Sequence, residues 1–360
     1  MSLSKRTEGR ARRASEGGRS HQVIVAGQRM GRFLAAVLVV AVAAPTLAAR
    51  AQGPAPLRLI QTIPLPDVNG RIDHLAVDLK GRRLFVAALG NNTLEVVDLH
   101  AGRRLRSVTG LREPQGVLYL PGRNRLFVTS ARDGTVEVFT GDSVNLEKRI
   151  KLGDDADNIR YDPAAKHLYV GYGRGRLAMI EAATGKRPAD IPLAGHPESF
   201  QLEAAGPRIF VNVPTANHIA VVDREKGTVV ATWPLTTTQA NFPMALDEPH
   251  HRLFVGCRRP ATLLVFDTES GKTVARLDST ADADDIFYDA ARGRIYLSGG
   301  EGFIEVFEQA DADHYRRVTT IPTAPGARTS LFVSELHRLY LAVPRRGGRE
   351  AEIRVYDMAP

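Results

Sequence analysis

Residues 82–108 read RRLFVAALGNNTLEVVDLHAGRRLRSV, and the pattern of this stretch recurs along the chain. An apolar tripeptide starts within it at residue 84, and related tripeptides start at residues 126, 168, 209, 253, 295 and 339. Each copy combines aliphatic and aromatic side chains, and successive copies start 41 to 44 residues apart. This period is typical of a β-propeller built from four-stranded blades.

Each repeat contains four short apolar runs separated by turns. In the first repeat these runs are Leu75–Asp78, Leu84–Ala87, Thr93–Asp98 and Leu105–Val108, with Gly and Asn in the turns. Alternation with a period of two between such turns indicates half-buried antiparallel strands, and the repeats contain no convincing helical periodicity. The sequence therefore predicts an all-β fold, a seven-bladed β-propeller of four-stranded antiparallel blades.

The seventh repeat is one strand short of a full blade. Its final apolar run is Ile353–Asp357, and the chain ends at Pro360. A separate run, Leu59–Leu65, precedes the first repeat and resembles the fourth strands of the other repeats. We predict that this N-terminal strand completes the last blade, which removes two exposed sheet edges. Residues 52–360 would then form a single propeller domain.

The N-terminal region has the features of a secretory signal peptide. An apolar stretch of 17 residues, Phe33–Ala49, follows two arginines and precedes the small-residue pattern Ala49-Arg50-Ala51. Such a short apolar core before a cleavage motif predicts export rather than a membrane anchor. We therefore expect residues 1–51 to be a leader, with Met30 as the true start. The location would be periplasmic or secreted, with no transmembrane anchor after cleavage.

The positive charge of the chain belongs to this leader. The full chain has 48 Lys or Arg and 40 Asp or Glu, of which residues 1–51 hold nine and two. The remaining 39 and 38 nearly balance. The predicted domain thus gives no electrostatic reason to expect nucleic acid as a partner. Cys257 is the only cysteine, so an internal disulfide is excluded.

Polar residues recur just before the innermost strand of each predicted blade. They occupy two adjacent columns when the repeats are aligned on the tripeptide, ten and eleven positions upstream of it. Equivalent positions of radially arranged blades surround one axis, so these side chains would meet at one mouth of the central channel. The residues that we expect to bind a ligand there are Asp73, His74, Asp157, Asn158, Glu198, Asp284, Asp285 and Arg328.

Several carboxylates at one mouth repel one another unless a cation, protonation or solvent offsets the repulsion. A divalent cation would be held by Asp157, Asn158, Glu198 and Asp284. Oxygen-rich ligands suit Ca²⁺ or Mg²⁺. The other interpretation is a water-filled channel lined by solvated polar residues, and the sequence leaves both interpretations open.

The repeats resemble the YVTN-type β-propeller repeat of bacterial YncE-like exported proteins. The resemblance rests on motifs such as Leu84-Phe85-Val86, followed by Asn91–Asp98 and Ala101-Gly102-Arg103, and covers residues 57–360. It implies a seven-bladed propeller in the periplasm or outside the cell. It also suggests a module that binds a protein, peptide or small molecule at the channel mouth or one face, without catalysis.

Two alternative functions stay open. Gluconolactonase-type propellers, which are similar in architecture only, bind a divalent ion at the channel mouth through carboxylates and Asn. There the metal would polarise a lactone carbonyl and Asp284 would act as general base. A redox-partner role would need a cofactor, and the sequence lacks recognisable attachment residues for one. His250-His251 and Asp311–His314 fall in turns that we expect to lie away from the channel.

The leader generates a prediction about export. N-terminal sequencing of the exported protein should start at or near Gln52, and a gene that begins at Met30 should be exported as well as the full gene. A requirement for residues 1–29 would show that Met30 is not the functional start.

Overall fold

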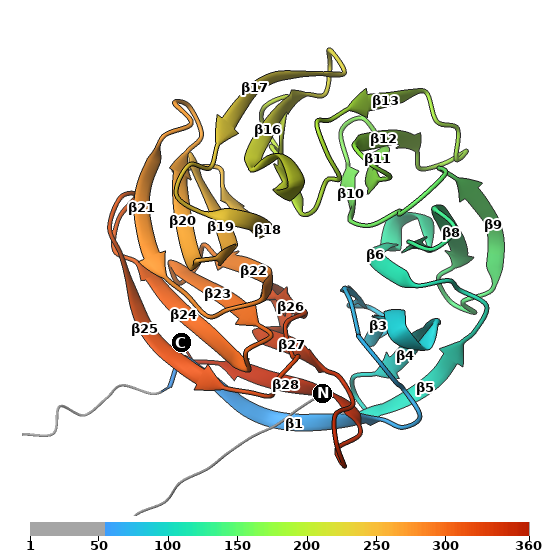
Figure 1. Ribbon diagram of the computed structural model, residues 1–360. Helices are drawn as coiled ribbons and strands as arrows, with labels where there is room; N and C mark the ends of the chain where they lie inside the picture. The colour runs from blue at the N-terminus through green and yellow to red at the C-terminus, as the bar shows by residue number, and fades with distance from the viewer. Residues whose placement is uncertain (1–54, 360) are drawn as a thin grey trace, which may run out of the picture. The chain divides into compact units, whose positions relative to one another are not determined.

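The computed structural model describes residues 55–359. Seven four-stranded antiparallel sheets follow one another around a ring in this part of the chain (Figure 1). The predicted seven-bladed propeller is therefore confirmed. The predicted leader, residues 1–51, with Met30 and the cleavage site before Gln52, lies outside the described residues. No helix among the described residues is long and apolar enough to cross a membrane.

The strands of each blade are numbered from the channel outward. Blade 1 contains β2 (Leu75–Asp78), β3 (Arg83–Ala88), β4 (Thr93–Asp98) and β5 (Arg103–Val108). Blade 2 contains β6 (Pro114–Leu120), β7 (Arg125–Ser130), β8 (Thr135–Thr140) and β9 (Leu146–Lys151). Blade 3 contains β10 (Ile159–Asp162), β11 (His167–Tyr172), β12 (Arg176–Glu181) and β13 (Ala189–Pro192).

The remaining blades repeat this order. Blade 4 contains β14 (Phe200–Leu202), β15 (Arg208–Val213), β16 (His218–Asp223) and β17 (Thr228–Pro234). Blade 5 contains β18 (Gln239–Asp247), β19 (Arg252–Arg259), β20 (Ala261–Asp267) and β21 (Thr273–Asp278). Blade 6 contains β22 (Ala283–Asp289), β23 (Arg294–Gly299), β24 (Phe303–Gln309) and β25 (Tyr315–Pro322). Blade 7 contains β26 (Ser330–Val333), β27 (Arg338–Val343), β28 (Ala351–Met358) and β1 (Leu57–Leu65).

Four short 3-10 turns connect strands within the described residues: η1 (Leu89–Asn91), η2 (Pro121–Arg123), η3 (Pro214–Ala216) and η4 (Ser334–Leu336). Each ends at a residue in the left-handed conformation, namely Asn92, Asn124, Asn217 and His337. Asn tolerates this conformation better than most residues, so its recurrence at these turns has a local cause.

The ring closes through β1, as the sequence predicts. β1 pairs antiparallel with β28, with Ile63 opposite Ile353 and Leu65 opposite Ala351. Figure 1 shows β1, in blue, beside the red strands of blade 7. Ile63 and Leu65 are fully buried in a cluster that also contains residues of blade 1. β1 therefore completes one blade and packs against the next.

The hydrophobic core lies between neighbouring blades. The aromatic residue of each tripeptide is buried, for example Phe85, Phe127 and Tyr169. The cluster around Phe85 contains Val117 and Leu126 of the next blade, so packing between adjacent blades holds the ring together. It also fixes the innermost strands at equivalent positions around the channel.

Removal of β1 should open the ring. Deletion of residues 52–66 exposes β28 as a sheet edge and removes two fully buried side chains, each worth about 1.5–3 kcal/mol. We expect a large fall in melting temperature and aggregation, measured by thermal unfolding and size-exclusion chromatography. Deletion of residues 52–54 alone is the control and should have no effect. A monomeric 52–66 deletion variant that melts like the intact chain would contradict the closure.

Candidate functional site

Two cavities lie on the axis of the ring. The upper cavity, of about 370 Å³, is called here the mouth. The mouth is lined by Arg71, Asp73, His74, Leu89, Glu113, Gln115, Ala131, Asp155, Asp157, His196, Glu198, Phe242, Arg258, Asp284 and Arg328. The lower cavity, of about 470 Å³, is called the chamber, and its walls come from the innermost strands of all seven blades. His74 lines both cavities.

The mouth contains six of the eight predicted ligand-binding residues: Asp73, His74, Asp157, Glu198, Asp284 and Arg328. Asp285 lines the chamber instead. Asn158 lines neither cavity and is only 2% exposed. Its amide nitrogen donates to Asp157 at 3.4 Å, and its oxygen has no hydrogen-bond partner among the described residues.

Several residues of the mouth escape the two sequence columns. Arg71, Glu113, Asp155 and His196 lie two positions before the first column. Side chains two residues apart on an extended chain point to the same side, so extending the same alignment by two positions finds them. Arg258 comes from the end of β19, the second strand of blade 5, and no column of the innermost strands contains it.

One half of the mouth neutralises its own charges. Arg71 binds Asp73 and donates to the Gln115 side-chain oxygen at 3.1 Å. Arg258 and Arg328 both bind Asp284, and the Arg328 Nε lies 2.8 Å from its carboxylate. Although burial opposes it, the charges of His74 and Arg71 lower the pKa of Asp73. For Asp284 burial prevails over the two guanidinium groups and raises the pKa to about 6.

The other half of the mouth has an excess of negative charge. Asp155, Asp157 and Glu198 face a single imidazole, that of His196, and no guanidinium forms an ion pair with them within the described residues. Burial, together with the charge of Asp157, raises the pKa of Glu198 to about 8. Hydrogen bonding to Asp157 and to the Gly173 carbonyl outweighs burial and raises the pKa of His196 to about 9.

Three side chains in this half have the geometry of a metal site. One ligand atom from each of Asp157, His196 and Glu198 can be chosen so that all lie within 4.8 Å of one another. The His196 Nδ1 donates to the Gly173 carbonyl oxygen at 2.6 Å, while Nε2 lies 3.6 Å from the Asp157 carboxylate. A carbonyl that accepts from one ring nitrogen leaves the other as a metal ligand when the ring is neutral.

Neighbouring blades hold Asp157 in place. The Thr129 hydroxyl of blade 2 donates to the Asp157 carbonyl oxygen at 2.5 Å, and the Gly116 amide donates to this hydroxyl at 2.7 Å. A Cβ atom at Gly116 would lie 2.5 Å from the same carbonyl oxygen. Glycine is therefore required at position 116 because the backbones of blades 2 and 3 approach so closely.

His74 separates the mouth from the chamber. Its Nε2 lies 3.6 Å from Asp73, and its Nδ1 lies 3.4 Å from Asp285. Although burial opposes it, the charges of Asp285 and Asp73 raise the pKa of His74 to about 10. Asp285 also accepts the Ser330 amide at 2.8 Å. His74 is thus a protonated bridge between two carboxylates.

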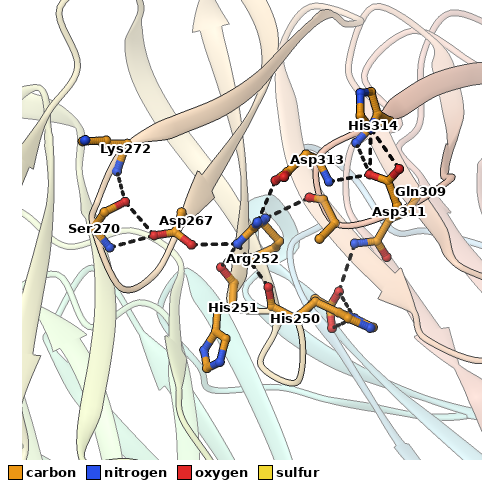
Figure 2. Close-up of polar contacts among 12 residues, drawn as sticks. His250, His251, Arg252, Asp267, Ser270, Lys272, Gln309, Asp311, Asp313 and His314 are labelled. Carbon is orange, nitrogen blue, oxygen red and sulfur yellow. Dashed lines mark hydrogen bonds and ion pairs between the residues drawn. The ribbon is translucent and has the colours of Figure 1, made fainter.

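The histidines of the turns lie in a separate ion-pair network, shown in Figure 2. Arg252 binds Asp267 of its own blade at 2.8 Å and Asp313 of blade 6 at 2.6 Å. His314 contacts Asp311 at 2.8 Å within the β24–β25 hairpin. None of these residues lines the mouth or the chamber, so this network joins the outer parts of two blades.

Comparisons with known proteins support the fold and a distant relationship. The YncE proteins of Salmonella typhimurium (strain LT2) and Salmonella typhi, both described as uncharacterized, are each 20% identical over 234 residues. The match spans 63% of this chain and 61% of those proteins. Hydrazine synthase of Kuenenia stuttgartiensis has a similar structure, with a TM-score of 0.69 and 17% identity over 77% of this chain and 93% of that chain. No family model matches.

The buried carboxylate of Glu198 should make stability fall as pH rises. Its pKa is about 8 in the folded protein against an ordinary value of 4.5, so the unfolded chain releases the proton first. Stability is lost between these two values, and Glu198→Gln should remove the loss. In protein treated with EDTA, we expect the variant to exceed the native protein at pH 8 by roughly 1–3 kcal/mol in urea unfolding, and to match it near pH 4.5.

Glu113→Gln is the matched control, because Glu113 belongs to the same mouth but pairs with Arg132. The stability profile of this control should run parallel to that of the native protein. A parallel profile for Glu198→Gln would show that Glu198 is ionised at little cost.

Proposed function

We propose that this protein is an exported β-propeller that binds a small ligand at its mouth through a divalent cation held by Asp157, His196 and Glu198. The distribution of charge carries the proposal. One half of the mouth pairs its carboxylates with arginines, whereas three carboxylates of the other half share one imidazole. A divalent cation supplies the positive charge that the second half lacks.

The donor set favours particular metals. Two carboxylates and one imidazole suit Mn²⁺ or Zn²⁺ better than Ca²⁺, which prefers six to eight oxygen ligands. The proposed set therefore differs from the sequence-based expectation of Ca²⁺ or Mg²⁺ with Asn158 and Asp284. His196 takes the place of these two residues, because Asp284 contacts two arginines and Asn158 lies outside the cavity.

The proposed ligand completes the coordination of the cation. Three protein ligands leave positions for an oxygen atom of a bound molecule. The mouth, at about 370 Å³, accommodates a small molecule or the end of a peptide. Distant similarity to the YncE proteins supports a propeller module of this kind, and the predicted leader supports export.

Metal-dependent hydrolysis is the second candidate. The open coordination positions favour it, because a metal there could polarise a carbonyl and bind the attacking water. Asp284, the base expected from the sequence, lines the same cavity. Turnover of sugar lactones by metal-loaded protein, lost in Asp284→Asn, would favour the hydrolase. Ligand binding without turnover would favour the binding module.

Metal addition should stabilise the protein by mass action. After EDTA treatment, Mn²⁺ or Zn²⁺ should raise the melting temperature more than Mg²⁺ or Ca²⁺. At a free concentration 100 times the Kd, the gain is about 2.7 kcal/mol. His196→Gln should abolish this rise, since it removes the only nitrogen ligand of the set.

His251→Gln is the matched control, because this imidazole is exposed and lies outside both cavities. The control should keep the full metal-dependent rise. An equal rise in His196→Gln, or no rise with any of the four cations in the native protein, would refute the metal site.

A further inference from the structure

The chamber below the mouth has mostly apolar walls. Aliphatic and aromatic side chains from the innermost strands surround it, including Leu75, Val117, Ile159, Met244 and Phe287. Its volume of about 470 Å³ falls within the range of about 300–1,000 Å³ typical of small-molecule pockets. The size and apolar character of the chamber suit an organic molecule.

Arg160 is exceptional among the residues of the chamber wall. It directly follows the apolar column of the innermost strands, and the equivalent residues of the other blades are Ala76, Leu118, Gln201, Ala245, Phe287 and Phe332. All of these are uncharged, so the guanidinium of Arg160 is the single charge at this level of the channel. The only other charged residues that line the chamber are His74 and Asp285, which pair with each other.

The guanidinium of Arg160 has no anionic partner. No described carboxylate forms an ion pair with it, whereas Arg71, Arg258 and Arg328 of the mouth each bind one. Its one hydrogen bond runs from Nη1 to the carbonyl oxygen of Ile159, the preceding residue, at 2.9 Å. The group also lies 5.7 Å from the centre of the Phe200 ring. Two nitrogen atoms of the fork therefore keep free donors.

Other polar groups of the wall are already engaged. The hydroxyls of Tyr119 and Tyr288 donate to Asn124 and Gln309, outside the chamber. The amide of Gln201 donates to the Met244 carbonyl, and the Ser330 hydroxyl bonds to Ser298. Among the wall's polar side chains, Arg160 and the Ser199 hydroxyl remain available.

We propose that the chamber binds a small organic monoanion, with its carboxylate on the guanidinium of Arg160 and its apolar body against the surrounding walls. A planar guanidinium can hold a carboxylate through two parallel hydrogen bonds. The pairing also supplies the counter-charge that a poorly solvated cation needs. One unpaired cation among apolar walls selects one acidic group on an apolar molecule.

This site is independent of the metal proposed for the mouth, so the test is made in EDTA. Isothermal titration calorimetry would use benzoate and octanoate as probes, benzyl alcohol and octan-1-ol as their neutral counterparts, and inorganic phosphate as an anion without an apolar body. We expect at least one of the two carboxylates to bind, at least tenfold more tightly than its alcohol and than phosphate.

Variants locate the binding site. Arg160→Gln should weaken binding of the carboxylate at least tenfold, and Arg160→Lys, which keeps the charge, should weaken it less. Arg176→Gln is the matched control, because Arg176 belongs to the same blade but is exposed on β12 and lines neither cavity. This control should bind the carboxylate as the native protein does.

Three results would overturn the proposal: no binding of either carboxylate, equal binding of the alcohol or of phosphate, or native-like binding by Arg160→Gln. The comparison of carboxylate with alcohol uses only the native protein, so it decides the matter even if Arg160→Gln fails to fold.

Discussion

Closure of the ring by the pairing of β1 with β28 is the constraint on which both cavities depend. Each innermost strand brings only a few side chains to the axis, so no single blade contains a site. Asp157 comes from blade 3, His196 and Glu198 precede blade 4, and Arg328 precedes blade 7. These groups meet because inter-blade packing sets equivalent strands around one axis, and an open ring would lose that arrangement.

Burial gives the two halves of the mouth different chemistry. Removal from water penalises every charge, but a carboxylate with an adjacent guanidinium recovers much of the penalty. The pKa of Asp73 is lowered because Arg71 and His74 adjoin it, whereas the pKa of Glu198 is raised to about 8 in the half without arginines. The same cavity therefore contains a charge-balanced half and a half that gains from binding a cation.

The sequence predicted the fold well because the repeat is regular. The tripeptides define the number of blades, and the missing strand after Ile353–Asp357 predicts the closure by Leu59–Leu65. The contacts within the mouth were less predictable. Arg258 reaches Asp284 from a second strand, and this contact depends on side-chain directions that alignment of innermost strands does not contain. His196 lay in reach of the same alignment, two positions further upstream.

Asn158 shows a different limit of reasoning from columns. It shares its column with His74 and Asp285, which line the channel, yet its own side chain is buried outside both cavities. Equivalent positions place Cα atoms alike, but the side chain follows its local partners, here the adjacent Asp157. A repeat therefore predicts where a site lies more reliably than which of its residues face a ligand.

The position of His74 links the two cavities physically. Its imidazolium contacts Asp73 in the mouth and Asp285 in the chamber, and its pKa of about 10 keeps it charged at neutral pH. A molecule that passed from one cavity to the other would have to displace this group from two carboxylates in a poorly solvated environment, which is costly. The channel is therefore better described as two compartments with different chemistry than as a continuous pore.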